Sequence, residues 1–118
     1  MRKLIEVDGK KIPFEANGAT PRLYRNLFHR DFLLDMDTLA KEASSGKQYG
    51  IETLEIFENI AFVMAKRGDP DNVPDTADEW LENFEMFSIY TVMPQLIQLW
   101  QISASPTVEL KKKIRNNG

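Results

Sequence analysis

The only histidine of the chain, His29, is the first candidate for acid–base chemistry. A histidine that acts as a general base needs a carboxylate that orients it and a pocket that holds substrate. The nearest following acid, Asp31, is close in sequence, and side chains at that spacing point to different sides of a helix. We therefore interpret His29 as a surface or helix-end residue and not as a catalytic base.

Acidic and amide side chains between Asp69 and Asp75 raise the possibility of calcium binding. Calcium-binding loops place oxygen ligands at alternate positions, continue with a glycine and end with a bidentate glutamate. Val73 and Pro74 stand where this pattern needs a ligand and a glycine. We interpret the segment as a solvated linker whose last acids begin a helix, and we expect no metal site.

Other patterns that mark enzymes are missing from the sequence. Ser45-Gly46-Lys47 lacks the upstream glycine and the preceding strand of a phosphate-binding loop. No serine has the context of a nucleophile elbow. The absence of cysteine excludes disulfides, thiolate metal ligands and a cysteine nucleophile. The sequence therefore predicts no catalytic residue and no cofactor, and it favours a protein that acts by binding other proteins.

Charge and hydropathy narrow the range of partners. A net charge of −3 disfavours a general nucleic-acid binder, although Lys111, Lys112, Lys113 and Arg115 gather near the C-terminus. No apolar run approaches the ~20 residues that span a bilayer, and the N-terminus has no stretch typical of a signal peptide. We expect a cytoplasmic protein that binds neither nucleic acid nor membrane.

The first residues predict a β-hairpin over residues 3–16. Asp8-Gly9, a dipeptide that favours tight turns with positive φ, separates two segments in which apolar residues alternate. Pro13 cannot donate a hydrogen bond to a neighbouring strand, so the second strand should lie at an edge. Because an isolated hairpin is only marginally stable, we expect it to pack on helices or to join a sheet in a neighbouring subunit.

Apolar residues at helical spacing predict the remaining elements. Thr20 is expected to cap the first helix, with Pro21 at its first helical position. Whether the runs 21–29 and 32–43 are continuous stays open. The predicted helices cover about 21–43, 51–67 and 77–101.

The later helices carry further signals. Thr76 and Glu79 form a capping box that begins a helix. Pro94, inside the last predicted helix, removes a backbone hydrogen bond and predicts a kink near Tyr90. The second half of the 51–67 helix is apolar nearly all round, which predicts that it is buried centrally or covered by a partner.

Together these elements predict a mainly α-helical α+β fold, in which an N-terminal β-hairpin precedes about four to five helices. Residues 1–102 are expected to form a single globular domain. Amphipathic periodicity is lost after that point, so residues 103–118 are expected to form a flexible basic tail.

Three segments are informative in their order along the chain: residues 17–25 (NGATPRLYR), 54–65 (LEIFENIAFVMA) and 76–85 (TADEWLENFE). In this order they resemble the tail assembly chaperones of long-tailed phages and prophages of Gram-positive bacteria. The resemblance extends from the hairpin to about Trp100. It consists of runs of similar residues and includes no catalytic signature.

The resemblance implies an assembly factor that coats the tape-measure protein, keeps it soluble, recruits tail-tube subunits and leaves before the tail is complete. It implies the cytoplasm of the bacterial host as the location and absence from the mature virion. Many family members also have a longer form made by a programmed ribosomal frameshift, which would be a further partner. Lys111-Lys112-Lys113 is then a candidate frameshift-encoded stretch, and this chain is the short, unshifted form.

A chaperone for a long helical partner needs exposed apolar or aromatic side chains. The candidate partner-binding residues lie on the 51–67 helix and on the helical segments after it: Phe57, Phe62, Val63, Trp80, Phe84 and Trp100. Packing into the core is the alternative for each, and the favoured one for any single residue. The edge hairpin is a candidate for self-association by strand addition.

Two other functions stay open beside this one. The first is a helical adaptor of a phage or mobile element that bridges proteins without chaperone turnover. The second is a small DNA-binding regulator. A regulator of that kind would need a basic recognition helix, whereas the helices expected here are acidic or apolar.

Overall fold

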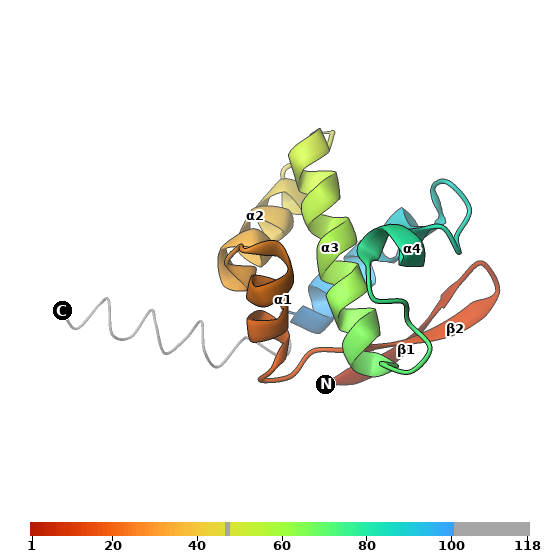
Figure 1. The fold of residues 1–118 in the computed structure, drawn as a ribbon. Helices are drawn as coiled ribbons and strands as arrows, with labels where there is room; N and C mark the ends of the chain where they lie inside the picture. Colours follow the sequence, from red (N-terminus) through yellow and green to blue (C-terminus); the bar gives the residue numbers. More distant parts are fainter. Residues whose placement is uncertain (47, 101–118) are drawn as a thin grey trace.

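The computed structural model describes residues 1–46 and 48–100. Within them an N-terminal β-hairpin precedes four α-helices, a short 3-10 helix and a helical stretch over residues 93–100 (Figure 1). The predicted fold class, mainly α-helical with an N-terminal hairpin, is confirmed. The expected tail over 103–118 lies outside the described residues.

β1 (Arg2–Val7) and β2 (Lys10–Glu15) form the predicted antiparallel hairpin. Asp8 and Gly9 connect them with φ angles of 54° and 76°, the left-handed conformation that this dipeptide adopts readily. The sheet has only these two strands in the described part of the chain. Pro13 therefore lies on an edge strand, as predicted.

α1 (Thr20–Phe28) and α2 (Phe32–Ser44) are separate helices. The chain turns between them at His29, which ends α1 with a positive φ of 57°. Asp31 then begins α2, because its side chain accepts a hydrogen bond of 3.1 Å from the backbone N–H of Leu34. The interpretation of His29 as an exposed helix-end residue is confirmed.

The prediction that Thr20 caps α1 is wrong. Ala19 occupies the cap position, and no side chain there bonds to the helix. The Thr20 hydroxyl instead accepts a hydrogen bond of 2.9 Å from the backbone N–H of Asn17. Thr20 is buried, and its hydroxyl closes the turn before the helix. It does not accept a hydrogen bond from the free backbone N–H groups in the first turn of α1.

The prediction of helices over 77–101, the last one from about Glu85 with a kink near Tyr90, is only partly right. α4 (Ala77–Leu81) is short, and a turn and the 3-10 helix η1 (Ser88–Val92) separate it from the helical residues 93–100. Pro94 falls in the first turn of that last stretch, where a helix has no use for its missing N–H. The chain therefore restarts a helix before Pro94 and avoids a kink.

Half of the predicted capping box is confirmed, since the Thr76 hydroxyl accepts a hydrogen bond of 3.2 Å from the backbone N–H of Glu79, while the described residues include no return bond to the Glu79 carboxylate. Tyr90 attaches the 3-10 helix η1 to the long helix that contains Glu58. The Tyr90 hydroxyl donates a hydrogen bond of 2.6 Å to the Glu58 carboxylate. This hydrogen bond, together with partial burial, raises the pKa of Tyr90 to about 12.

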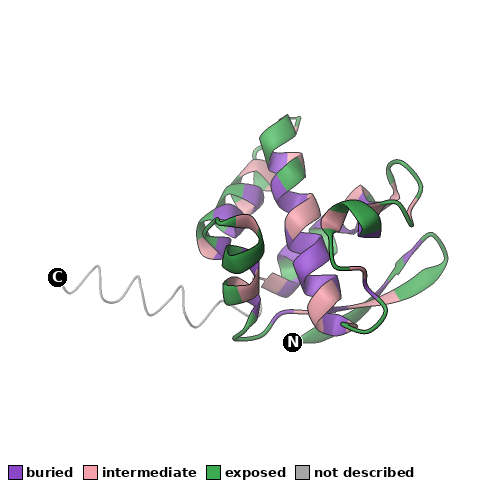
Figure 2. Cartoon of the chain, in the orientation of Figure 1, coloured by how far each residue is buried: buried purple, intermediate pink, exposed green. Residues whose placement is uncertain are grey.

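α3 (Ile51–Gly68) is the central element, and β2, α1, α2 and α4 all pack against it. Figure 2 shows buried residues along most of its length. Residues 60–65 are all buried, whereas a helix that packs on one side only exposes some residues in every turn. The prediction of a centrally buried helix is therefore confirmed. The hairpin lies closest at Gly68, where an added Cβ would stand 2.1 Å from the carbonyl oxygen of Pro13.

Replacing Gly68 with alanine should therefore force β2 away from the end of α3. We expect Gly68→Ala to lower the free energy of unfolding by about 2 kcal/mol, the usual cost of overpacking a filled interior. Gly18→Ala is the control, because nothing lies within 4 Å of a Cβ built there. Urea unfolding of both variants measures the difference, and equal stabilities would contradict the close approach of α3 and β2.

Candidate protein-interaction sites

The six candidate partner-binding residues lie in the core or against it. Four of them are buried, with exposed fractions of 3 % or less: Phe57, Phe62, Val63 and Trp80. Phe84 and Trp100 are partly buried, and their rings lie 5.0 Å from Trp80 and 5.6 Å from Phe32, centroid to centroid. These residues therefore pack in or against the core, which was the favoured alternative for each of them. The structure buries the first four because the elements around α3 pack over its second half.

Two large apolar side chains that the sequence reasoning missed are exposed instead. Met86 and Phe87 are 79 % and 70 % exposed, in the turn between α4 and η1. They lie where the chain leaves the helical geometry predicted over 77–101. We call residues 85–88 the apolar turn.

The carboxylate of Asp8 attaches the apolar turn to the tip of the hairpin. One of its oxygen atoms accepts a hydrogen bond of 2.9 Å from the backbone N–H of Glu85, and the other accepts one from the Ser88 hydroxyl. The Ser88 bond, followed by the Glu85 bond, holds the pKa of Asp8 below its ordinary value. The attachment is therefore complete above the ordinary aspartate pKa and is lost as the pH falls through the lowered one.

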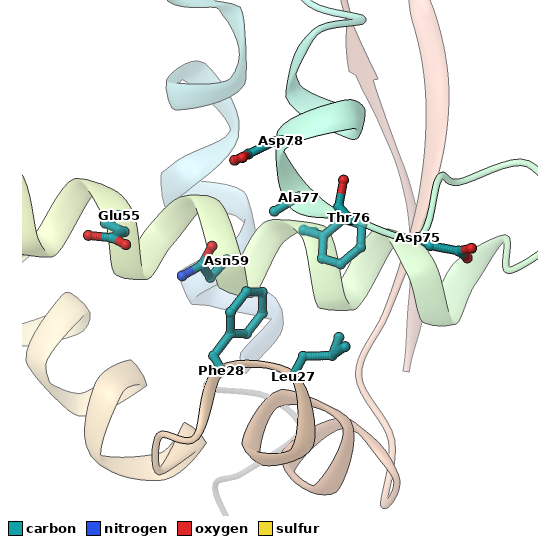
Figure 3. A pocket seen from close by; sticks show the side chains of 9 residues that line it. Leu27, Phe28, Glu55, Asn59, Asp75, Thr76, Ala77 and Asp78 are labelled. Carbon is teal, nitrogen blue, oxygen red and sulfur yellow. The ribbon is translucent and has the colours of Figure 1, made fainter.

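A hollow of about 320 Å³ lies between the end of α1, the middle of α3 and the start of α4 (Figure 3). Its apolar lining comes from Leu27 and Phe28 on α1 and from Phe62 on α3, with the two phenylalanine rings 6.5 Å apart. Two of these residues are accessible, since Leu27 is exposed and Phe28 half-buried.

Three acidic residues lie around this hollow. In Figure 3 Glu55, Asp78 and Asp75 lie on three sides of it, with Leu27 and Phe28 on the fourth, and the Asp75 carboxylate points away from the hollow. All three acids are exposed. We call this feature the acidic hollow.

The acidic segment 69–75 directs several of its oxygen atoms towards Lys66. The Lys66 ammonium group donates hydrogen bonds of 3.1 Å and 2.6 Å to the carbonyls of Pro70 and Val73. It also lies 3.2 Å from Asp75 Oδ1. These oxygens hold the loop against α3. Among the described residues, no group of three or more His, Cys, Asp or Glu is placed to bind a metal ion.

A buried ionic cluster fixes the joint between α1 and α2. Asp35 is 5 % exposed and accepts hydrogen bonds from the Tyr24 hydroxyl and from Arg30, whose Nε and Nη2 lie 2.7 Å and 2.9 Å from its two oxygens. Burial alone would raise the pKa of Asp35, but these hydrogen bonds and the Arg30 charge outweigh it and lower the pKa. Both carboxylate oxygens are engaged, so we interpret the cluster as structural.

Because the pKa of Asp35 is lowered on folding, its contribution to stability is present above the ordinary aspartate value and is lost as the pH falls through the lowered one. We expect Asp35→Asn to lower the free energy of unfolding at neutral pH by about 1–2 kcal/mol, less than the cost of breaking a fully buried ion pair, because the Arg30 side chain is 44 % exposed and water screens its charge. The variant should also lose part of its acid sensitivity. Chemical unfolding at several pH values measures both effects.

Asp37→Asn provides the comparison, because Asp37 pairs with Lys41 on the exposed face of α2. Its loss should change stability by less than about 0.5 kcal/mol. If both variants lost the same stability, the buried cluster would not be what holds α1 to α2.

Asp8→Asn tests the attachment of the apolar turn. Asparagine tolerates the left-handed turn conformation but has one acceptor oxygen where the aspartate has two. We expect faster hydrogen exchange at residues 85–88 with an intact hairpin, and the same change in the wild type as the pH is lowered through the pKa of Asp8. Hydrogen exchange followed by mass spectrometry reads out both, and unchanged protection of this segment would contradict the assignment.

Comparison with models of known protein families, with curated proteins and with solved structures found no match. None of the helices in the described part of the chain has the length and apolar character needed to cross a membrane.

Proposed function

We propose that this chain is a tail assembly chaperone of a long-tailed phage or prophage, in its short form. It binds the tape-measure protein, keeps that protein soluble and recruits tail-tube subunits. The family assignment rests on the order of the three resembling segments. The structural observation that carries the binding function is the apolar turn, in which Met86 and Phe87 are exposed and held by Asp8.

The three resembling segments support the proposal because they are adjacent in space as well as ordered in sequence. Residues 54–65 form most of α3, and α1 and α4, which contain much of residues 17–25 and 76–85, both pack against it. Residues of the second and third segments also line the acidic hollow. The likeness thus covers one continuous part of the molecule.

The size of the apolar turn suits a contact that must later be exchanged. Burying one Met or Phe side chain contributes about 1.5–3 kcal/mol, so the pair gains at most about 6 kcal/mol before the cost of association. A single contact of that size is weak and dissociates readily. Many copies of the chain, each making one such contact, cover a long tape-measure protein until tail-tube subunits displace them.

The remaining parts of the proposal follow from this role. The chaperone acts in the cytoplasm of the bacterial host and is absent from the mature virion. Its further partners are the tail-tube protein and a longer frameshifted form of itself.

Co-expression with the tape-measure protein of the same gene cluster tests the proposal. Wild type should keep the tape-measure protein in the soluble fraction, and the double variant Met86→Ser, Phe87→Ser should lose at least half of that effect. Leu34→Ser is the matched control, because Leu34 is 66 % exposed on the separate helix α2. A tape-measure protein that precipitates equally with and without the chain would refute the chaperone function.

The same complex distinguishes a chaperone from an adaptor. Purified tail-tube protein, added to the soluble complex, should release this chain from the tape-measure protein in size-exclusion chromatography. A chain that stays bound in a ternary complex would instead identify an adaptor without turnover.

A further inference from the structure

The acidic hollow has a charge that the described residues do not balance. Asp75 shares Lys66 with two backbone carbonyls, and no ion pair or side-chain hydrogen bond engages Glu55 or Asp78 within residues 1–46 and 48–100. These carboxylates surround exposed apolar surface at Leu27. A ligand that complements the hollow must therefore combine apolar side chains with several positive charges.

One segment of this chain has that composition. Residues 110–115 read Leu-Lys-Lys-Lys-Ile-Arg, so four cations accompany two aliphatic side chains. Leu110 and Ile114 flank the three lysines in the sequence. The cations are opposite in charge to the unpaired Glu55 and Asp78 carboxylates, and the aliphatic side chains suit the exposed apolar lining of the hollow at Leu27.

The position of Trp100, the last described residue, puts this segment within reach. The Trp100 ring lies 5.6 Å from Phe32, which lies 5.3 Å from Tyr24, which in turn lies 5.3 Å from Phe28 in the lining of the hollow. The residues between Trp100 and Leu110 can span on the order of 30 Å when extended. The connection is therefore long enough to bring Leu110 to the hollow from Trp100.

We propose that residues 110–115 bind the acidic hollow of their own chain. Tethering gives the segment an effective concentration in the millimolar range, so an intrinsic dissociation constant near ~1 mM already gives half occupancy. Any partner peptide with basic and apolar side chains must displace this segment to enter the hollow. The proposal is independent of the proposed function, since it needs no phage protein.

Paramagnetic relaxation in the full-length chain tests this directly. The chain contains no cysteine, so Asn116→Cys gives one site for a nitroxide spin label next to the basic segment. We expect loss of amide signals at residues 55–59 and 75–78 at low ionic strength. The loss should diminish in 1 M salt, because the Debye length falls from about 10 Å at 0.1 M to about 3 Å.

Charge reversal identifies the site of contact. In the spin-labelled protein, the pair Glu55→Lys and Asp78→Lys should restore most of the lost signal. Asp71→Lys together with Glu6→Lys makes the same change in net charge at exposed residues outside the hollow, and should leave the broadening in place. Equal restoration by both pairs would overturn the proposal in favour of general electrostatic attraction.

Two further outcomes count against the proposal. No broadening at either segment of the hollow in the spin-labelled chain would show that the tail does not bind there. Contacts between copies are measured in a mixture of two proteins. One is isotope-labelled and has no spin label, and the other carries the spin label and has no isotope label. Broadening of equal size in that mixture would assign the contact to a neighbouring copy and overturn binding within one chain.

Discussion

The structure depends on one constraint, which is that the second half of α3 has to be covered on every side. Its residues from Ile60 to Ala65 are buried in succession, so no face of this part of the helix is exposed to water. The hairpin strand β2, α1, α2 and α4 pack against α3, and Tyr90 of η1 adds contacts to Phe57 and Glu58. At Gly68 the cover is so close that the helix and the β2 backbone nearly touch.

This constraint explains why the residues predicted to bind a partner are part of the core or pack against it. An over-apolar helix is compatible with a partner surface or with a central position, and its sequence does not distinguish the two. Phe57 and Phe62 lie on different sides of α3, and both are buried because the short elements after it fold back over it. The apolar turn then lies on the covering elements, and the acidic hollow lies where α1 and α4 meet α3.

Much of the fold could be predicted because its signals are local. Asp8-Gly9 specifies a turn by backbone conformation, and the apolar pattern of residues 51–67 specifies a long buried helix. The Thr76 cap is likewise a contact across three residues. The two errors have different causes. At Thr20 a competing local contact decides, because its hydroxyl accepts from the backbone N–H of Asn17, three residues earlier. After Leu81 a distant contact decides, because the chain leaves helical geometry and its Glu85 N–H bonds to Asp8. No periodicity within that segment reports on a carboxylate so far away in sequence.

The same Asp8 carboxylate has a consequence for the order in which the molecule becomes functional. Its two hydrogen bonds join residues separated by 77 and 80 positions, which is most of the length of the described chain. Closing a loop of that size costs entropy before the contact forms, so contacts of this kind form late in folding. A chain still emerging from the ribosome, before residues 85–88 have reached the hairpin tip, lacks the anchored apolar turn. The exposed Met86 and Phe87 pair is thereby presented in a fixed position only by molecules that have finished folding.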